Sequence, residues 1–276
     1  MKQCGSREND CFSWTHKNSA AIKMTTQTRT SKVPAVTLAF WVAKIAATTL
    51  GETGGDAVSM SLNLGYLVAS AIFGLIFLLA LTLQVSAKRY HPFTYWFVIV
   101  ATTTVGTTVS DYLDRTAGLG YPLASAILFA LVLVSLAVWR FSTGSISVAE
   151  ITDRKTEIFY WVTILIPNTL GTALGDYLAD SESFGFAGGA MVFGGIIALI
   201  AVLYYFTSIS RTALFWAAFI LTRPLGATLG DILTKPLAHG GLNLDRIQSS
   251  LALAAFMIAC ILLTNLRKPS SAATGH

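Results

Sequence analysis

The segment TLGETGGD at residues 49–56 returns three times along the chain, as TVGTTVSD (104–111), TLGTALGD (169–176) and PLGATLGD (224–231). Each copy begins eight residues after a tryptophan and ends on an aspartate. The four pairs are Trp41 and Asp56, Trp96 and Asp111, Trp161 and Asp176, and Trp216 and Asp231. A glycine lies ten residues after every tryptophan, at 51, 106, 171 and 226. The chain is therefore a fourfold repeat that places one aspartate in each of four apolar segments.

The composition predicts a membrane protein. Hydrophobic residues make up 54% of the chain and charged residues 12%, against about 25% charged residues in soluble domains. The charges leave eight apolar windows, near 35–57, 63–86, 93–113, 120–139, 157–178, 185–206, 212–233 and 248–266. Each has roughly the 17–25 residues that a transmembrane helix needs, and none alternates as barrel strands do. We expect an all-α integral membrane protein with eight transmembrane helices.

The windows define the expected organisation of the chain. Residues 1–31 are polar, lack the apolar core of a signal peptide, and are expected to be a disordered cytoplasmic tail in which Met24 is a second candidate start. Residues 32–266 are the expected membrane domain, and 267–276 a short C-terminal tail. The repeats are placed at about 35–88, 89–141, 155–207 and 210–266.

Each repeat holds two helices, the first carrying the motif and the second almost entirely apolar. Two crossings return the chain to its starting side, so the four motif helices are expected to run parallel. Repeats one and three are offset by 120 residues, as are repeats two and four, which indicates a duplicated pair. Four similar parallel helices can surround a pseudo-fourfold axis, which would bring their aspartates into one layer.

Basic residues predict the orientation. Ten lysines and arginines fall on one side of the predicted membrane, and only Arg115, Lys235 and Arg246 fall on the other. Both termini are therefore expected in the cytoplasm, in a bacterial inner membrane. The net charge of +5 then reflects topology, so no nucleic-acid partner is expected. The expected partners are the lipid bilayer and a small cation, and a homo-oligomer is left open.

Helical periodicity places hydroxyl groups on the same face as the carboxylates. Counting from the tryptophan, positions +8, +11 and +15 share one side of each motif helix. The predicted cation-binding residues on this face are Thr49, Glu52, Asp56, Thr104, Asp111, Thr169, Asp176 and Asp231. The four aspartates are also the candidate metal ligands. The glycines at +10 lie beside this face, where small residues let membrane helices approach closely.

Four carboxylates around one axis would repel one another. Two unit charges about 6 Å apart interact by roughly 3 kcal/mol at an effective dielectric constant near 20. The set must bind a cation, hold protons or be neutralised by internal bases. Two such bases exist, Lys44 and Arg223, and both are candidates for gating or ion pairing. Lys44 lies two helical turns before Glu52 and could pair with it.

These features also have purely structural explanations. An aspartate near the outer end of a helix can accept hydrogen bonds from a loop, and Lys44 can extend to the cytoplasmic edge. Arg223 can be an internal ion-pair partner, and the tryptophans can be interfacial anchors or packing residues. Motifs of intramembrane aspartyl proteases, phosphate-binding loops and clustered histidines are missing from the sequence, so neither an enzyme nor a cofactor is expected.

The versions LGETGGD, VGTTVSD, LGTALGD and LGATLGD, each preceded by its tryptophan, resemble a bacterial family of so-called membrane-anchored proteins. That resemblance covers about residues 35–266 and implies four tandem copies of a two-helix repeat. The family's function is poorly defined, so the resemblance implies topology more than activity. The Glu-Thr-Gly-Gly-Asp of the first repeat is also weakly similar to the Glu-x-Gly-Asp motif of manganese exporters.

The sequence thus favours a secondary transporter that moves a small cation along the repeat axis. Carboxylate and hydroxyl oxygens suit hard ions better than copper or zinc. A divalent metal such as manganese is the first candidate for the transported ion, and protons are expected as the coupling ion. The alternative is a non-transporting membrane scaffold or sensor subunit, in which the motifs only pack and order the helices.

Overall fold

The computed structural model describes residues 32–87, 89–148, 151, 153–181 and 185–266. Regular structure in these residues is helical throughout. The long helices are α2 (Leu38–Asp56), α3 (Gly65–Ser86), α4 (Pro92–Asp111), α5 (Tyr121–Thr143), α6 (Arg154–Asp176), α7 (Gly185–Phe206), α8 (Arg211–Thr234) and α9 (Arg246–Leu266). Their bounds lie within a few residues of the predicted windows, so the prediction of eight helices is confirmed. The predicted tails, 1–31 and 267–276, lie outside the described residues.

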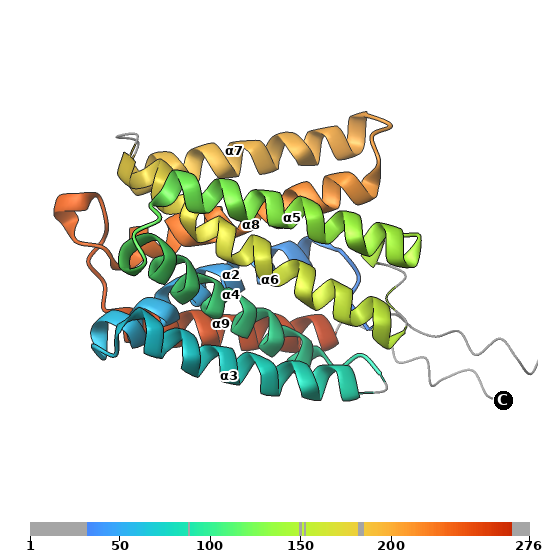
Figure 1. The fold of residues 1–276 in the computed structure, drawn as a ribbon, viewed down its shortest axis with the longest axis horizontal. Helices are drawn as coiled ribbons and strands as arrows, with labels where there is room; N and C mark the ends of the chain where they lie inside the picture. Colours follow the sequence, from blue (N-terminus) through green and yellow to red (C-terminus); the bar gives the residue numbers. More distant parts are fainter. Residues whose placement is uncertain (1–31, 88, 149–150, 152, 182–184, 267–276) are drawn as a thin grey trace, which may run out of the picture. The chain divides into compact units, whose positions relative to one another are not determined.

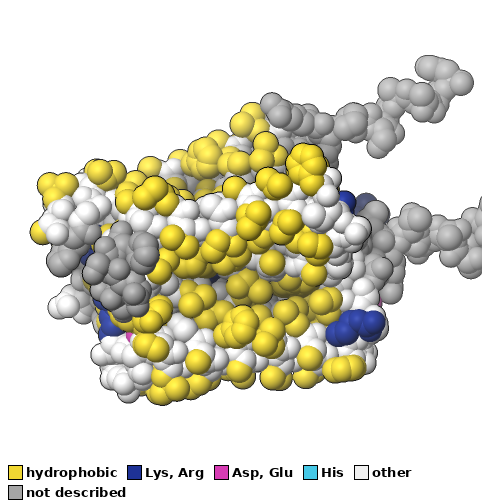
Figure 2. Space-filling model, turned by 90° about the horizontal axis from the view of Figure 1, so that it is seen from above, with side chains coloured by type: hydrophobic (Ala, Val, Ile, Leu, Met, Phe, Trp, Pro, Cys, Tyr) yellow, Lys and Arg dark blue, Asp and Glu magenta, His cyan; other side chains and the backbone are white. Residues whose placement is uncertain are grey.

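Six of these helices are long and apolar enough to cross a membrane, namely α3, α5, α6, α7, α8 and α9. The chain is therefore a multi-pass membrane protein. The other two, α2 and α4, are more polar because α2 carries Lys44, Glu52 and Asp56, while α4 is rich in threonine. Most of their side chains are buried among the other helices. Apolar side chains cover much of the face drawn in Figure 2, with basic side chains toward its two ends.

The motif helices α2, α4, α6 and α8 form a closed set of neighbours. Helix α2 packs on α4, α4 on α6, α6 on α8, and α8 on α2. We call these four the inner helices. Each remaining helix packs mainly on the inner helix of the repeat that follows it: α3 on α4, α5 on α6, α7 on α8, and α9 on α2. In Figure 1, α3 and α7 lie at opposite edges of this array. No repeat buries its own helices alone, so the four must fold together.

The repeated glycines explain how closely the inner helices approach. A Cβ added to Gly51 or Gly226 would collide with the threonine seven residues after the next repeat's tryptophan, Thr103 or Thr48. A Cβ on Gly106 would lie 2.7 Å from the backbone carbonyl carbon of Asn168. A Cβ on Gly171 would likewise collide with Arg223, so at all four interfaces the repeated glycine contacts the residue seven positions after the next repeat's tryptophan. The glycines are packing residues, as their spacing predicted.

The aspartates lie at a change of helix type. Five-residue π-helical turns follow three of them, at Ala57–Ser61, Tyr112–Thr116 and Tyr177–Ser181. In the fourth repeat, α8 continues as α-helix past Asp231 to Thr234. A π-turn widens the helix and is often found at functional sites. The aspartates therefore lie about one turn before the chain leaves the helix, and not at its last carbonyls.

The tryptophans pack at the other end of the inner helices. Trp96, Trp161 and Trp216 are buried, whereas Trp41 is partly exposed. Trp96 and Trp161 contact Tyr95, whose hydroxyl lies 2.6 Å from that of Tyr160. These residues belong to one continuous aromatic cluster. The tryptophans are packing residues here. We refer below to the tryptophan end and the aspartate end of the inner helices.

Candidate functional site

Five buried acids lie near the aspartate end of the inner helices. We call them the acidic layer: Glu52, Asp56, Asp111, Asp176 and Asp231, each at most 3% exposed. One carboxylate oxygen from each of Glu52, Asp176 and Asp231 lies within 4.8 Å of the others. These three residues come from repeats one, three and four. The structure therefore brings three of the predicted cation-binding carboxylates close together, those of Glu52, Asp176 and Asp231.

Arg115 connects Asp111 to the next repeat. It lies four residues after Asp111, on the π-turn that follows α4, and its Nε is 3.3 Å from Asp111 Oδ1. Its Nη2 donates to Asp176 Oδ2 at 3.0 Å. Asp111 Oδ2 is buried and has no hydrogen-bond partner among the described residues. One guanidinium therefore joins the aspartates of repeats two and three and leaves one oxygen free.

Lys235 forms the corresponding connection between repeats four and one. It follows α8 directly, and its Nζ is 3.2 Å from Asp231 Oδ1 and 3.1 Å from Asp56 Oδ2. Arg246, at the start of α9, adds a third basic group 3.7 Å from Asp56 Oδ2. Burial lowers the pKa of Lys235, but the surrounding carboxylates, Asp231 and Asp56 foremost, together raise it by more, so the net pKa lies above its ordinary value. Lys235 therefore remains a cation at neutral pH.

Glu52 is paired with Arg223 and not with Lys44. Arg223 Nη2 donates to Glu52 Oε2 at 3.0 Å, and the hydroxyls of Thr107 and Thr172 lie against the same nitrogen. Arg223 has no exposed surface. The Lys44–Glu52 pair suggested by the sequence does not form. Arg223 of the fourth repeat pairs with Glu52 across the α2–α8 interface instead. Arg223 is an ion-pair partner, one of the two roles predicted for it.

Lys44 lies deeper, toward the tryptophan end. Its side chain is fully buried and does not reach an exposed edge. The ammonium lies 4.2 Å from the centre of the Phe219 ring and 3.5 Å from Asn168 Oδ1. Asn168 in turn donates to the Thr102 hydroxyl at 2.9 Å. An aromatic ring and one long amide contact stabilise a charge on this buried amine only weakly, so Lys44 is a second internal basic group apart from the acidic layer.

The three predicted threonines are buried but bond to their own helices. The hydroxyls of Thr49, Thr104 and Thr169 donate to the carbonyl oxygens four residues earlier, at 2.9 to 3.3 Å. Their oxygens keep lone pairs, but the hydroxyls that contact the Glu52–Arg223 pair are those of Thr107 and Thr172. These two occupy position +11, the position of Glu52 itself, which the sequence had placed on the same face.

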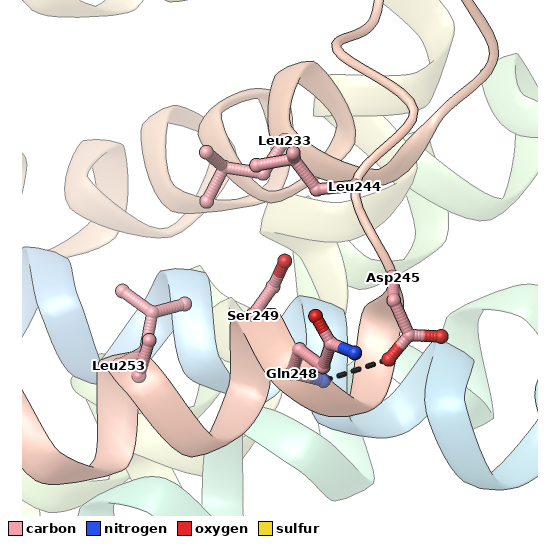
Figure 3. A pocket seen from close by; sticks show the side chains of 7 residues that line it. Leu233, Leu244, Asp245, Gln248, Ser249 and Leu253 are labelled. Atoms are coloured by element: carbon pink, nitrogen blue, oxygen red, sulfur yellow. Dashed lines mark hydrogen bonds between the residues drawn. The ribbon is translucent and has the colours of Figure 1, made fainter.

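The basic groups form the more exposed side of the layer. The side chains of Arg115 and Arg246 are 33% and 25% exposed, and that of Lys235 is 14% exposed. The carboxylates that they contact are almost completely covered. The side chains of Arg115, Lys235 and Arg246 therefore lie between the buried carboxylates and the exposed surface at the aspartate end. A groove of about 390 Å³ between the end of α8 and the start of α9 does not include the layer. Leu233, Leu244 and Asp245 line it (Figure 3).

Sequence reasoning missed the bridging bases. Arg115 and Lys235 were assigned to the outer side but not to the site. The signal was present, because each follows an aspartate by four residues, the spacing of neighbours on one helix face. A further pair, Lys32 and Glu157 at 2.7 Å, joins the segment before α2 to α6, and Gln84 donates to the same glutamate. That pair has no counterpart in the repeat motif, so its position could not be inferred from it.

The comparisons with known proteins identify the repeat but no activity. One family's sequence profile, described as Repeat of Unknown Function (DUF347), matches residues 39–90, 94–145, 159–210 and 214–268. Each match spans one inner helix and the helix that follows it. No curated protein and no solved structure was found to match the chain. The predicted fourfold repeat is therefore confirmed.

Proposed function

The chain belongs to the family of the Repeat of Unknown Function (DUF347), and we propose that it is a multi-pass membrane transporter for a small cation. In this proposal the four inner helices surround a pseudo-fourfold axis, all eight long helices cross the bilayer, and the cation passes through the acidic layer. We assign it no catalytic role.

The observation that carries the proposal is the acidic layer itself. Ionisable groups inside a membrane protein are costly and usually mark an ion pathway or a proton relay. Here every repeat contributes one buried aspartate, and Glu52 is added beside them. A scaffold could hold its helices together through the glycine contacts alone. Five buried acids at the aspartate end of the inner helices are better explained by a need for positive charge.

The built-in bases give the proposed mechanism. Arg115, Lys235 and Arg223 contact the carboxylates in the structure, so an incoming cation competes with them for the same oxygens. Such competition lets a site bind an ion when one side is open and release it when the base returns. The oxygens of the layer suit hard ions, and a divalent metal such as manganese remains the first candidate. The partly exposed bases would form the outer gate.

The proposed setting follows from the distribution of basic residues. The three basic groups near the acidic layer would face outward, and the basic-rich tryptophan end would face the cytoplasm. This places both termini in the cytoplasm and the chain in a bacterial inner membrane. Movement of repeats one and two against repeats three and four would open the layer to either side, in which case Arg115 and Lys235 would span the moving interface.

A second candidate function is a membrane scaffold or sensor subunit. The observation that favours it is that each of Glu52, Asp176 and Asp231 already has a basic partner. In that case the ion pairs only lock the inner helices together.

Ion flux distinguishes the two candidates. The full-length protein is reconstituted into proteoliposomes, and uptake of Mn²⁺, Na⁺, K⁺ and H⁺ is measured under an imposed membrane potential and an imposed pH gradient. A transporter moves at least one of these ions faster than protein-free liposomes do. If none moves while the reconstituted protein still unfolds cooperatively on heating, the transport proposal is wrong and the scaffold is favoured.

A further inference from the structure

The residue at position +7 of each repeat fits over the glycine of the preceding repeat. In the first three repeats it is Thr48, Thr103 or Asn168, all short and uncharged, whereas the fourth repeat places Arg223 there. The side chain of Arg223 crosses Gly171 and extends further along the inner helices. It therefore reaches position +11, one turn closer to the aspartates, where the other repeats carry oxygen-bearing side chains.

Four oxygen atoms converge on the tip of Arg223. Nη2 faces Glu52 Oε2 at 3.0 Å, the hydroxyls of Thr107 and Thr172, and the Thr103 carbonyl oxygen at 3.5 Å. An NH₂ group has only two hydrogens to donate. Nη2 can therefore donate to only two of these oxygens at once, and Glu52 Oε2 also accepts from the two threonine hydroxyls. The four oxygens outnumber the hydrogens that Nη2 offers them.

The rest of the guanidinium is poorly satisfied. Nε and Nη1 of Arg223 are buried, and neither has a hydrogen-bond partner among the described residues. Three N–H groups are thus left unpaired while four oxygens crowd the remaining two. A buried charged group with unmet donors is costly. Arg223 is therefore an imperfect occupant of this position, and an ion that accepts several oxygens at once would fit it better.

The charge of these four donors favours a monovalent ion. Asp176 shares Arg115 with Asp111, and Asp231 shares Lys235 with Asp56, so these aspartates are held by other bases. Among the four oxygens at Arg223 Nη2, that of Glu52 carries the one negative charge, because the hydroxyls and the carbonyl are neutral. A single positive charge balances this set of donors. One carboxylate, two hydroxyls and a carbonyl are also hard oxygen donors.

We propose that Glu52, Thr107 and Thr172 form a binding site for a small alkali-metal ion such as Na⁺, which Arg223 fills in its absence. Resting on the proposed function, this site holds the coupling ion, in place of the protons expected from the sequence. Entry of Na⁺ would free Arg223 and change the charge balance of the neighbouring aspartates. The binding site itself does not require that the protein transports anything.

The test replaces the competitor with the residue that repeats one and two carry at the same position. Arg223→Thr opens the site, and the double variant Arg223→Thr/Glu52→Gln opens it without the carboxylate. Arg223→Lys is the matched control that keeps the charge. The thermal unfolding of each full-length protein is followed in NaCl, LiCl, KCl and choline chloride at constant ionic strength, and binding is measured with ²²Na⁺.

Arg223→Thr should be stabilised by Na⁺ over choline and should bind Na⁺ with an affinity at least about tenfold higher than wild type. Arg223→Lys and the double variant should show neither effect. The wild-type protein should show weak Na⁺ protection that Glu52→Gln removes. Because these readouts are binding readouts, they hold or fail independently of any flux.

Three results overturn the proposal. The first result is that Arg223→Thr folds but has the same unfolding temperature in NaCl and in choline chloride. The second result is that the stability of Arg223→Thr depends on pH but not on the cation present. It would mean that a proton and not a metal ion replaces Arg223. The third is failure to recover Arg223→Thr from sodium-containing medium while the double variant is recovered, because an ion able to fill the site would have been present.

Discussion

Arg115 and Lys235 stand 120 residues apart and make equivalent bridges. Each joins the aspartate of its own repeat to an aspartate of the following repeat, Asp111 to Asp176 and Asp231 to Asp56. The bridges therefore span the two interfaces between the duplicated halves of the chain. The interfaces inside each half, α2 with α4 and α6 with α8, carry no such aspartate bridge in the described residues. The glycine contacts thus recur at all four interfaces between inner helices, whereas the aspartate bridges occur at two of them.

The first prediction concerns these bridges. Arg115→Gln should lower the free energy of unfolding by on the order of 2 kcal/mol, because it leaves Asp111 and Asp176 buried without their cation. Adding Asp176→Asn should recover part of that loss, since a neutral amide needs no counter-charge. Thermal unfolding of the four proteins of this double-mutant cycle measures the coupling. Arg140→Gln, at an exposed arginine of α5, should have little effect. Strictly additive losses would mean that the bridge does not stabilise the fold.

A second prediction concerns pH. The pKa of Lys235 is raised above its ordinary value of 10.5, because burial lowers it and the surrounding carboxylates, Asp231 and Asp56 foremost, together raise it by more. Its contribution to stability is therefore complete below that value and is lost only as pH rises through the higher folded pKa. The difference in unfolding temperature between wild type and Lys235→Gln should not shrink as the pH rises from about 6 to about 9. A difference that shrinks with rising pH in this range would show that Lys235 loses its proton there.

The glycine contacts give a third prediction. Gly106→Ala places a methyl group 2.7 Å from backbone atoms of α6, which cannot rotate away as a side chain can. We expect a loss of about 1–3 kcal/mol in the free energy of unfolding from the overpacking. Gly74→Ala is the matched control, because Gly74 is also helical and has nothing within 4 Å of an added Cβ. That substitution should be neutral or slightly stabilising. Equal effects of the two would contradict close packing at Gly106.

Lys44 allows a fourth test, now of transport. Lys44→Met replaces a buried ammonium by an apolar group of similar size, which is often neutral or stabilising. Removing its repulsion should let the transported cation bind more tightly and leave more slowly, so both KM and the maximal flux should fall. Ile99→Met, at the same position of the second repeat, should change neither. Proteoliposome uptake at several cation concentrations provides both constants. An unchanged KM and flux would exclude Lys44 from the pathway.

The helices and the acids could be predicted because local sequence determines them. Long apolar windows set the helix bounds, and one register repeated four times placed Asp56, Asp111, Asp176 and Asp231 at the same position of each motif helix. The glycines likewise indicated which face would be packed. These inferences needed only helix periodicity and the requirement that a buried backbone be hydrogen-bonded.

The partners of the acids could not be predicted in the same way. Arg223 and Glu52 are 171 residues apart, and they meet because α8 closes on α2 and completes the ring of inner helices. The Lys44–Glu52 pair was inferred from spacing along one helix. That spacing does not reveal that Arg223, from another repeat, pairs with Glu52 instead. The second reach of Arg115, to Asp176, also depends on how α4 packs on α6. Side-chain contacts between repeats require the three-dimensional arrangement.

Cation uptake by proteoliposomes with and without the shared aspartates tests the central claim most directly. Wild type, Asp111→Asn and Asp176→Asn are reconstituted at equal density, with insertion checked for each. We expect each asparagine variant to lose at least about tenfold in the initial rate of uptake, because the layer then lacks a charge that the passing cation must meet. Wild-type rates in both variants, at equal insertion, would contradict the claim that the acidic layer carries the ion.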